Sequence, residues 1–213
     1  MKFIKNSSSK NKTSFYLTII TTVLLILVGF SGCSKSSENK NKLVVVGIQS
    51  DVSTISPLYA FDLQEGHLLD LLFLKPAFEN WNDSLGIIEL KPMLAESWVI
   101  NKDSNFVTLN LRKNLKWSDG KPITVDDIIF SLDIYSDPKV NSRLYGLFNN
   151  FYTSNDLHID IKKTFRKNSE TSVTIFFKDY QNFTFLDINH AIMPAHIYKN
   201  IKREDVETSD VNF

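Results

Sequence analysis

The stretch of sequence that decides the fold is residues 94–135, LAESWVINKDSNFVTLNLRKNLKWSDGKPITVDDIIFSLDIY. Its first half predicts two strands, 96–100 and 106–111, joined by the polar link NKDSN. In the second strand, the apolar residues Val, Leu and Leu at 107, 109 and 111 alternate with Thr, Asn and Arg. A period of two indicates a strand with one buried face and one solvated face.

The second half of this stretch predicts a turn followed by a helix. Ser118-Asp119-Gly120 is typical of a turn, because glycine adopts positive φ without steric cost. Thr124 is a typical N-cap, so we expect a helix over 125–135 that ends before Pro138. Asp126 and Asp127 fall in its first turn, where the helix dipole favours acidic side chains.

Working outward, the flanking sequence predicts four further elements. The apolar run LVVVGI at 43–48 favours a buried strand, and 63–73 favours an amphipathic helix ending at Lys75-Pro76. Alternating apolar residues over 157–161 and 173–177 predict two strands, and the polar sequence KNSE between them favours a hairpin. The whole pattern predicts a mixed α/β fold.

Composition excludes several classes of protein. Among 213 residues, 24 basic side chains balance 24 acidic ones, so bulk charge argues against nucleic-acid binding. Hydrophobic residues make up 43% and charged residues 23%, as in ordinary globular proteins. A single cysteine rules out an intrachain disulfide and a cysteine-rich zinc site.

The N-terminus has the pattern of an export signal. Residues 1–12 carry four lysines and no acid, and the apolar run 15–30 is followed by Ser31-Gly32-Cys33. This resembles the lipobox of bacterial lipoproteins, in which the cysteine is acylated and becomes the mature N-terminus, although Phe30 stands where the usual motif has leucine. An uncleaved membrane anchor and ordinary secretion are the alternatives, because about 20 apolar residues span a bilayer.

The central stretch also resembles a known family, the family 5 extracellular solute-binding proteins of peptide and nickel ABC importers. Order and spacing match the family pattern at Ala95-Glu96-Ser97-Trp98, Leu111-Arg112-Lys113, Trp117-Ser118-Asp119-Gly120, Pro122 and Thr124-Val125-Asp126-Asp127. Two outlying segments are also similar to it, Ser53-Thr54-Ile55-Ser56-Pro57 and Met193-Pro194-Ala195-His196. We expect Trp98, Arg112 and the 117–120 turn to serve the structure, with both tryptophans in the core.

The resemblance implies the periplasmic-binding-protein-like (class II) fold, in which two lobes close over the ligand. It implies that this chain carries the N-terminal lobe only, because family members are much longer and continue into a second lobe. The expected organisation is a lipoprotein signal peptide at 1–32, an acylated Cys33 with a flexible tether at 33–42, and the truncated solute-binding domain at 43–213.

By the same resemblance, the expected function is substrate binding for an ABC importer. The partners would be an oligopeptide or dipeptide, or a nickel chelate, together with the permease and the membrane through the lipid anchor. No cofactor is expected. The protein would lie on the outer face of the cytoplasmic membrane, or in the periplasm or at the outer membrane. Ligand-binding candidates are the loop Ser53-Thr54-Ile55, through backbone pairing, and Tyr145.

Two alternatives remain open, a lipid-anchored surface hydrolase and a gene remnant without function. A hydrolase needs a convergent catalytic group, and the sequence shows none. Ser118 and Asp119 are neighbours on one turn and cannot form a nucleophile–base pair. His190 and His196 are six residues apart, which does not place them on one helical face as metal ligands.

Overall fold

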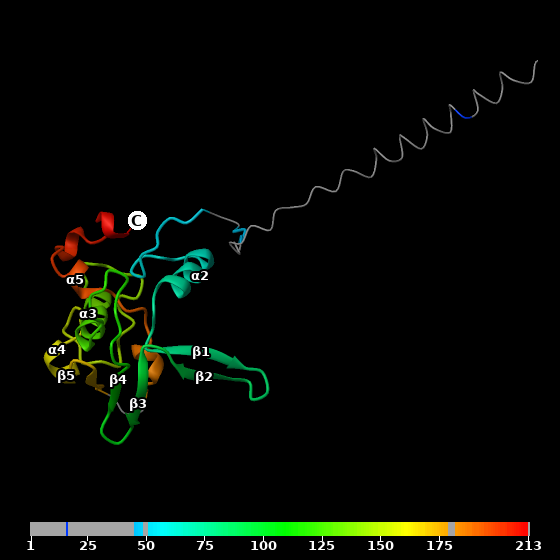
Figure 1. The fold of residues 1–213 in the computed structure, drawn as a ribbon. Helices are drawn as coiled ribbons and strands as arrows, with labels where there is room; N and C mark the ends of the chain where they lie inside the picture. Colours follow the sequence, from blue (N-terminus) through cyan, green and yellow to red (C-terminus); the bar gives the residue numbers. More distant parts are fainter. Residues whose placement is uncertain (1–15, 17–44, 49–50, 179–181, 213) are drawn as a thin grey trace, which may run out of the picture. The chain divides into compact units, whose positions relative to one another are not determined.

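The computed structural model describes residues 16, 45–48, 51–178 and 182–212 (Figure 1). The chain divides into two units, Met1–Gly47 and Ile48–Phe213, and the fold described below belongs to the second. Its helices and strands, in chain order, are α2 Leu63–Leu72, β1 Ala77–Asn82, β2 Ile87–Pro92, β3 Ala95–Asn101, β4 Phe106–Leu111, α3 Val125–Ser136, α4 Ile161–Thr164, β5 Phe165–Ser169, β6 Ser172–Phe176 and α5 Ala195–Tyr198. Three short 3₁₀ helices lie at Phe185–Ile188, Arg203–Asp205 and Asp210–Asn212.

The main sheet has four antiparallel strands in the order β3-β4-β6-β5. In β4, Val107, Leu109 and Leu111 are buried while the residues between them are half-buried. The neighbouring strand β6 buries Val173 and Ile175. The predicted strand pair and its alternation are therefore confirmed.

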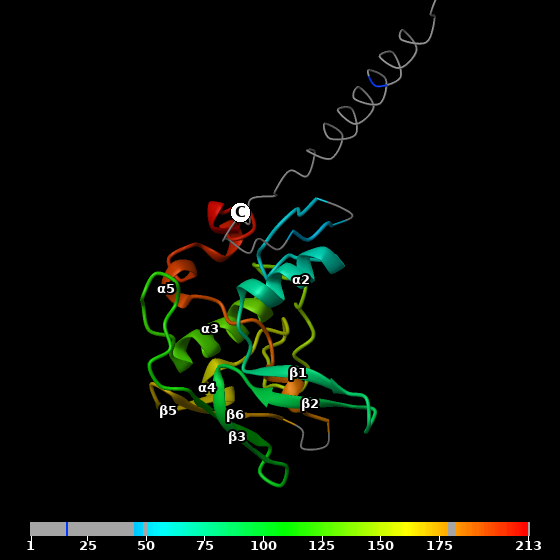
Figure 2. The same ribbon diagram turned by 45° about the vertical axis from the view of Figure 1, so that its right-hand side comes forward.

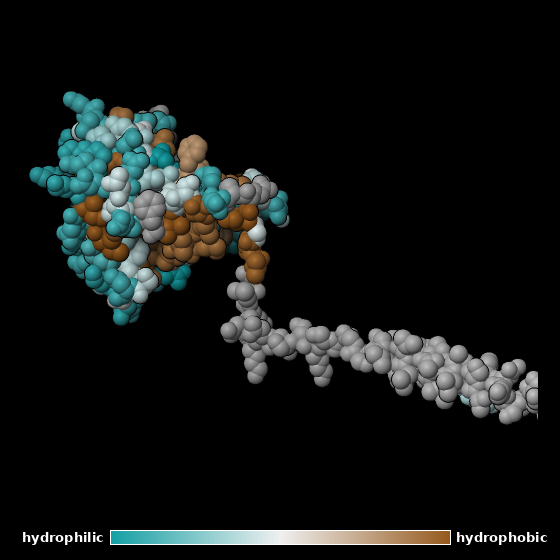
Figure 3. All heavy atoms as spheres, turned by 90° about the horizontal axis from the view of Figure 1, so that it is seen from above, coloured by the Kyte–Doolittle hydropathy of each residue, from teal (hydrophilic) through white to brown (hydrophobic). Residues whose placement is uncertain are grey.

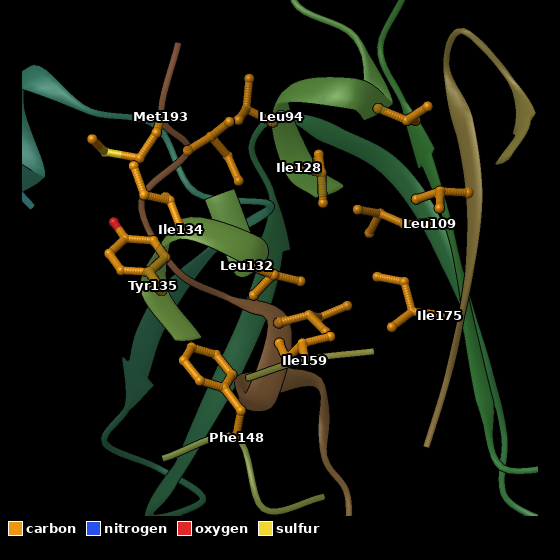
Figure 4. Close-up of a cluster of buried hydrophobic side chains, with 14 of the residues drawn as sticks. Leu94, Leu109, Ile128, Leu132, Ile134, Tyr135, Phe148, Ile159, Ile175 and Met193 are labelled. Carbon is orange, nitrogen blue, oxygen red and sulfur yellow. The ribbon is translucent and has the colours of Figure 1, made fainter. Parts of the chain in front are cut away.

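Helix α3 and the sheet share one hydrophobic core. Ile128 and Leu132 of α3 lie in the same buried cluster as Leu109 and Ile175 of the sheet (Figure 4). All four side chains are at most 1% exposed. Burial of these side chains removes apolar surface from water, which is the main favourable term in folding.

The start of α3 is fixed by a capping box. The Thr124 hydroxyl accepts a hydrogen bond from the N–H of Asp126, and the Asp127 carboxylate accepts one from the N–H of Thr124 at 2.9 Å. Asp127 also accepts the N–H of Ala195 at 3.0 Å, so it ties α3 to the start of α5. The prediction that both acids belong to the helix start is confirmed.

A second hairpin, β1–β2, was not predicted and projects away from the main sheet (Figures 1 and 2). Its turn is built by Asn82, whose side-chain oxygen accepts the N–H groups of Ser84 and Leu85, and by Gly86 at φ 65°. Its strands lack a clean apolar alternation because both faces are largely exposed, and Trp81 is 59% exposed.

Two predicted strands are wrong. Residues 45–48 have no regular structure, and Val45 and Val46 are exposed; the rest of the predicted strand 43–48 lies outside the described residues. The segment 157–161 turns at Leu157, which has φ 65°, and α4 begins at Ile161. The hairpin itself exists, but its first strand is β5, so its turn lies at 170–171.

The helix predicted over 63–73 is confirmed as α2, which ends before Lys75-Pro76. Its apolar side, however, is only partly covered: Leu68 and Leu69 are half-buried. Leu71 is 83% exposed and Leu72 58%, while the buried residue of this helix is Glu65.

Candidate functional site

A groove of about 560 Å³ opens beside α2, and we call it the α2 groove. Its walls come from α2, the start of β1, the C-terminal half of α3 and the segments 143–144 and 186–191. This volume falls in the range of about 300–1,000 Å³ that is usual for ligand pockets. Seen from above, the molecule also shows a continuous apolar area among hydrophilic side chains (Figure 3).

Charged side chains of both signs line the α2 groove. Lys75 forms an ion pair with Asp70, with 2.9 Å between Nζ and Oδ1. Glu79 accepts a hydrogen bond from the Asn189 side-chain amide at 2.8 Å, and Arg143 donates to the carbonyl oxygen of Ala60. Each of these charged groups already has a partner within the chain, so a charged ligand would have to compete with these bonds.

Tyr135 and His190 line one side of the α2 groove, and Phe148 packs behind His190 in the core. The His190 ring lies 6.0 Å from that of Tyr135 and 5.6 Å from that of Phe148, measured between centroids. The Tyr135 hydroxyl donates to the carbonyl oxygen of Ala191 at 3.0 Å. Burial lowers the pKa of His190, with Asp187 acting in the opposite direction. The imidazole is therefore neutral at neutral pH.

The predicted ligand-binding loop does not line the α2 groove. The N–H groups of Ser53 and Thr54 both donate to Oε1 of Glu65, at 3.0 and 3.2 Å, and the Thr54 hydroxyl donates to the carbonyl oxygen of Asn212. Ile55 lines a separate pocket. The loop's first two amides are thus already bonded within the chain.

Tyr145 also lies away from the α2 groove lining. It is half-buried, and its hydroxyl donates to the carbonyl oxygen of Asp156 at 2.8 Å. The structure therefore does not bring the four predicted ligand-binding residues together, and their role stays a prediction.

Glu65 is a buried residue that sequence reasoning missed. Its carboxylate accepts four backbone N–H groups, those of Ser53, Thr54, Phe61 and Asp62, at 2.7–3.3 Å. The signal was Asp62 three residues earlier, which completes a capping box with it. Glu65 therefore holds the 53–55 loop against the start of α2.

The 117–120 motif forms the predicted turn. Gly120 has φ 86°, and its N–H donates to the carbonyl oxygen of Trp117 at 2.9 Å. The prediction that Trp98 and Trp117 lie in the core is corrected: both are half-buried and pack against its edge. Arg112 is exposed and donates to the carbonyl oxygen of Pro92.

The structure brings a histidine to this turn that the sequence did not place there. His196 Nε2 lies 2.9 Å from Asp119 Oδ2. Among the hydrogen bonds of these described residues, none joins Ser118 to His196, so the nucleophile–base contact of a serine hydrolase is not formed. Nor do the described ranges bring together three or more His, Cys, Asp or Glu side chains that could hold a metal ion.

Solved structures of two ligand-binding proteins have a similar fold. The fold is similar to that of NikZ from Campylobacter jejuni, determined in complex with Ni(L-His), with a TM-score of 0.59 and 27% identity. That match covers 78% of this chain and 29% of NikZ. The oligopeptide-binding protein AppA from Bacillus subtilis, in complex with a nonapeptide, has the same fold at a TM-score of 0.59 and 21% identity, over 76% of this chain and 29% of AppA.

Sequence comparison then gives the family. The family model of bacterial extracellular solute-binding proteins, family 5 (Middle), matches residues 89–212, more than half of the chain. The chain belongs to this family. It is 34% identical to a probable ABC transporter-binding protein of Deinococcus radiodurans over 50% of this chain and 17% of that protein. It is 47% identical to the periplasmic oligopeptide-binding protein OppA of Escherichia coli over 24% of this chain and 9% of OppA.

The chain thus spans less than a third of the length of each of these relatives. In the portion that the structure describes, no helix combines the length and the apolar character needed to cross a bilayer. Cys33 and the apolar run before it lie outside the described residues.

Proposed function

We propose that this chain forms part of a lipid-anchored peptide receptor of an ABC importer and supplies one wall of its ligand site. The observation that carries the proposal is the α2 groove, which presents both signs of charge and an aromatic wall in a fold of the solute-binding family. The ligand would be captured outside the cytoplasmic membrane and passed to a permease. Cys33 would carry the lipid anchor.

A peptide suits the groove because its two ends carry opposite charges. Lys75 and Arg143 would bind a carboxylate and Asp70 and Glu79 an ammonium group, once the ligand displaces the Lys75–Asp70 ion pair and the bonds to Ala60 and Asn189. The names of two relatives support this ligand, the oligopeptide-binding protein OppA and the dipeptide-binding protein DppE of Bacillus subtilis, which is 36% identical over 28% of this chain. Charge-assisted hydrogen bonds of this kind are stronger than neutral ones.

The 53–55 loop would extend the site by backbone pairing. The N–H groups of Ser53 and Thr54 would then have to exchange the Glu65 carboxylate for carbonyl oxygens of the peptide. Main-chain pairing accepts many sequences because it does not involve ligand side chains. Tyr145 would join the site only if its bond to Asp156 were released.

A nickel chelate is the second candidate ligand, because NikZ was solved with Ni(L-His) and is 27% identical to this chain. His67 and His190 both line the α2 groove. Since no cluster of three ligating side chains occurs in the described parts of the chain, the chelating molecule would have to supply most of the metal ligands itself.

Chemical-shift mapping tests where the ligand binds. Adding trialanine to isotope-labelled protein is expected to shift resonances of groove residues such as Lys75, Glu79 and His190. The matched control is trialanine blocked at both ends, which lacks both charges and should shift these resonances much less. Nickel–histidine at the same concentration tests the second ligand.

Equal shifts with free and blocked peptide, or shifts confined to surfaces away from the α2 groove, would show that the charged groove is not the peptide site. Shifts at His67 and His190 with nickel–histidine alone would favour the chelate.

A further inference from the structure

The outer end of the β1–β2 hairpin is apolar, and we call its residues Trp81, Leu85, Ile87 and Ile88 the hairpin tip. These side chains are 59%, 64%, 50% and 50% exposed, on an element that projects away from the main sheet (Figures 1 and 2). Trp81 stands directly opposite Ile88, while Ile87 points to the other face and Leu85 lies in the turn. Clustered apolar side chains on a protein surface mark an interaction site.

The base of the hairpin is fixed to the body of the fold. Ala77 is buried, and Leu90 packs against the core. The Asn189 side chain accepts the N–H of Ala77 and donates to the Glu79 carboxylate, each at 2.8 Å. The hairpin therefore holds its tip away from the fold on a firmly attached base.

The polar groups of the turn already have partners inside the hairpin. The side-chain oxygen of Asn82 accepts the N–H groups of Ser84 and Leu85, both at 3.0 Å, and its carbonyl oxygen accepts the N–H of Gly86 at 2.8 Å. The Asn82 amide donates to Glu89 at 2.6 Å. Hydrogen-bonded groups cost far less to remove from water than unbonded ones, so the turn can leave bulk water at low cost.

Apolar side chains on both faces and in the turn favour a partner that surrounds the hairpin tip. A folded protein covers one face of a hairpin, whereas a bilayer interface takes up apolar side chains from every side. Tryptophan is enriched at this interface, because its ring is apolar and its N–H stays hydrated. Asp83 is exposed in the turn and would limit the depth to the hydrated headgroup region, because a charge is costly deeper in the bilayer.

Basic side chains near the base of the hairpin fit an anionic lipid surface. Lys91 is exposed and lies four residues from Ile87, about 14 Å along the strand. Arg112 donates to the carbonyl oxygen of Pro92, next to Lys91, and the exposed Lys113 follows it. Both glutamates of the hairpin are hydrogen-bonded to asparagine side chains. Anionic membrane surfaces attract basic side chains over about a Debye length.

We propose that the hairpin tip docks into the headgroup region of the membrane that carries the lipid anchor, with Lys91, Arg112 and Lys113 next to anionic headgroups. This rests on the proposed function only for the anchor, which would keep the chain close to a bilayer. A tethered second contact forms readily because its effective concentration is high. Attachment at two points would fix the orientation of the α2 groove relative to the membrane.

Quenching of tryptophan fluorescence by brominated lipids tests the proposal, because bromine quenches only nearby indoles. The full chain has three tryptophans, none of them before residue 81, and its apolar run 15–30 would hold it in vesicles. In vesicles of phosphatidylcholine and phosphatidylglycerol, brominated close to the headgroups, we expect quenching that is lost in Trp81→Phe. Vesicles of phosphatidylcholine alone should quench less, because the basic side chains then lack anionic partners.

Two matched variants separate the hairpin tip from other exposed apolar positions. Ile88→Asp places a charge directly opposite Trp81 and should abolish the quenching that depends on Trp81. Val99→Asp, at 57% exposure on β3, adds the same charge elsewhere and should leave it unchanged. Circular dichroism checks that both variants fold. Leu85→Ser, a change in the exposed turn, should weaken the quenching and serves if Ile88→Asp does not fold.

The proposal is overturned if Trp81→Phe is quenched as strongly as the parent, or if Ile88→Asp and Val99→Asp behave alike. A change in Trp81 emission that follows protein concentration and not lipid would assign the hairpin tip to a second copy of the chain, and would also overturn it. These variants leave Cys33 and the α2 groove unchanged. Fatty-acid labelling and the trialanine shifts therefore test the proposed function separately.

Discussion

Glu65→Ala is expected to lower the free energy of unfolding by roughly 1–3 kcal/mol, because it removes a buried carboxylate that accepts four partly buried backbone N–H groups. The carboxylate is 3% exposed and joins two loops through four backbone hydrogen bonds. Chemical denaturation measures the loss. Glu96→Ala, at an exposed position of β3, is the control and should change stability by less than about 0.5 kcal/mol. Equal stabilities of the two variants would contradict the role of Glu65.

Protonation of the Glu65 carboxylate at low pH should reproduce part of this loss of stability. The N–H of Phe61 lowers the pKa of the Glu65 carboxyl most strongly; burial opposes it, and the N–H groups of Asp62, Ser53 and Thr54 lower it further. A lowered pKa means that the folded state favours the ionised form. The stabilisation is full above about pH 4.3, the ordinary pKa of glutamate, and is lost as the pH falls through the lowered value. Glu65→Gln should lack this part of the acid dependence.

Cys33→Ala is expected to abolish lipid attachment completely. The lysines before residue 13, the apolar run 15–30 and Ser31-Gly32-Cys33 motivate this prediction. Acyl chains contribute roughly 0.8 kcal/mol per buried methylene group, so two or more chains hold a protein firmly at a membrane. Cells labelled with a fatty-acid analogue should mark the parent chain and leave the variant unmarked.

Ser34→Ala is the matched control, because it changes the neighbouring small residue and keeps the cysteine; it should label like the parent. Equal labelling of the parent and Cys33→Ala would place the lipid elsewhere than Cys33, and no labelling of the parent would mean that the segment is an uncleaved anchor or an ordinary secretion signal.

The parts of the fold that the sequence predicted are those with local signals. Strand β4 alternates apolar and polar residues, and α3 begins at a capping box that can be read from Thr124 and Asp127. The segment 157–161 shows the limit of that reasoning. Its apolar and polar residues alternate as they do in a strand. The backbone turns instead, because Leu157 adopts positive φ and Asp160 caps α4.

The candidate sites could not be predicted in the same way, because long-range contacts form them. Asn189 accepts the N–H of Ala77 across 112 positions, and His196 reaches Asp119 across 77. No local pattern encodes such pairs. The buried role of Glu65 could be read in part from the capping box with Asp62, but its bonds to the 53–55 loop could not.

The central claim is that this chain contributes one wall of a larger ligand site, and calorimetric titration with di- to pentapeptides tests it most directly. A receptor that encloses its ligand gains binding free energy from contacts on both sides. A single wall makes fewer contacts, and these must still offset the translational entropy that the ligand loses on binding. We therefore predict for the monomeric protein a dissociation constant weaker than the low micromolar range. A low micromolar or tighter constant would contradict the claim, because it would mean that these residues alone carry a complete site.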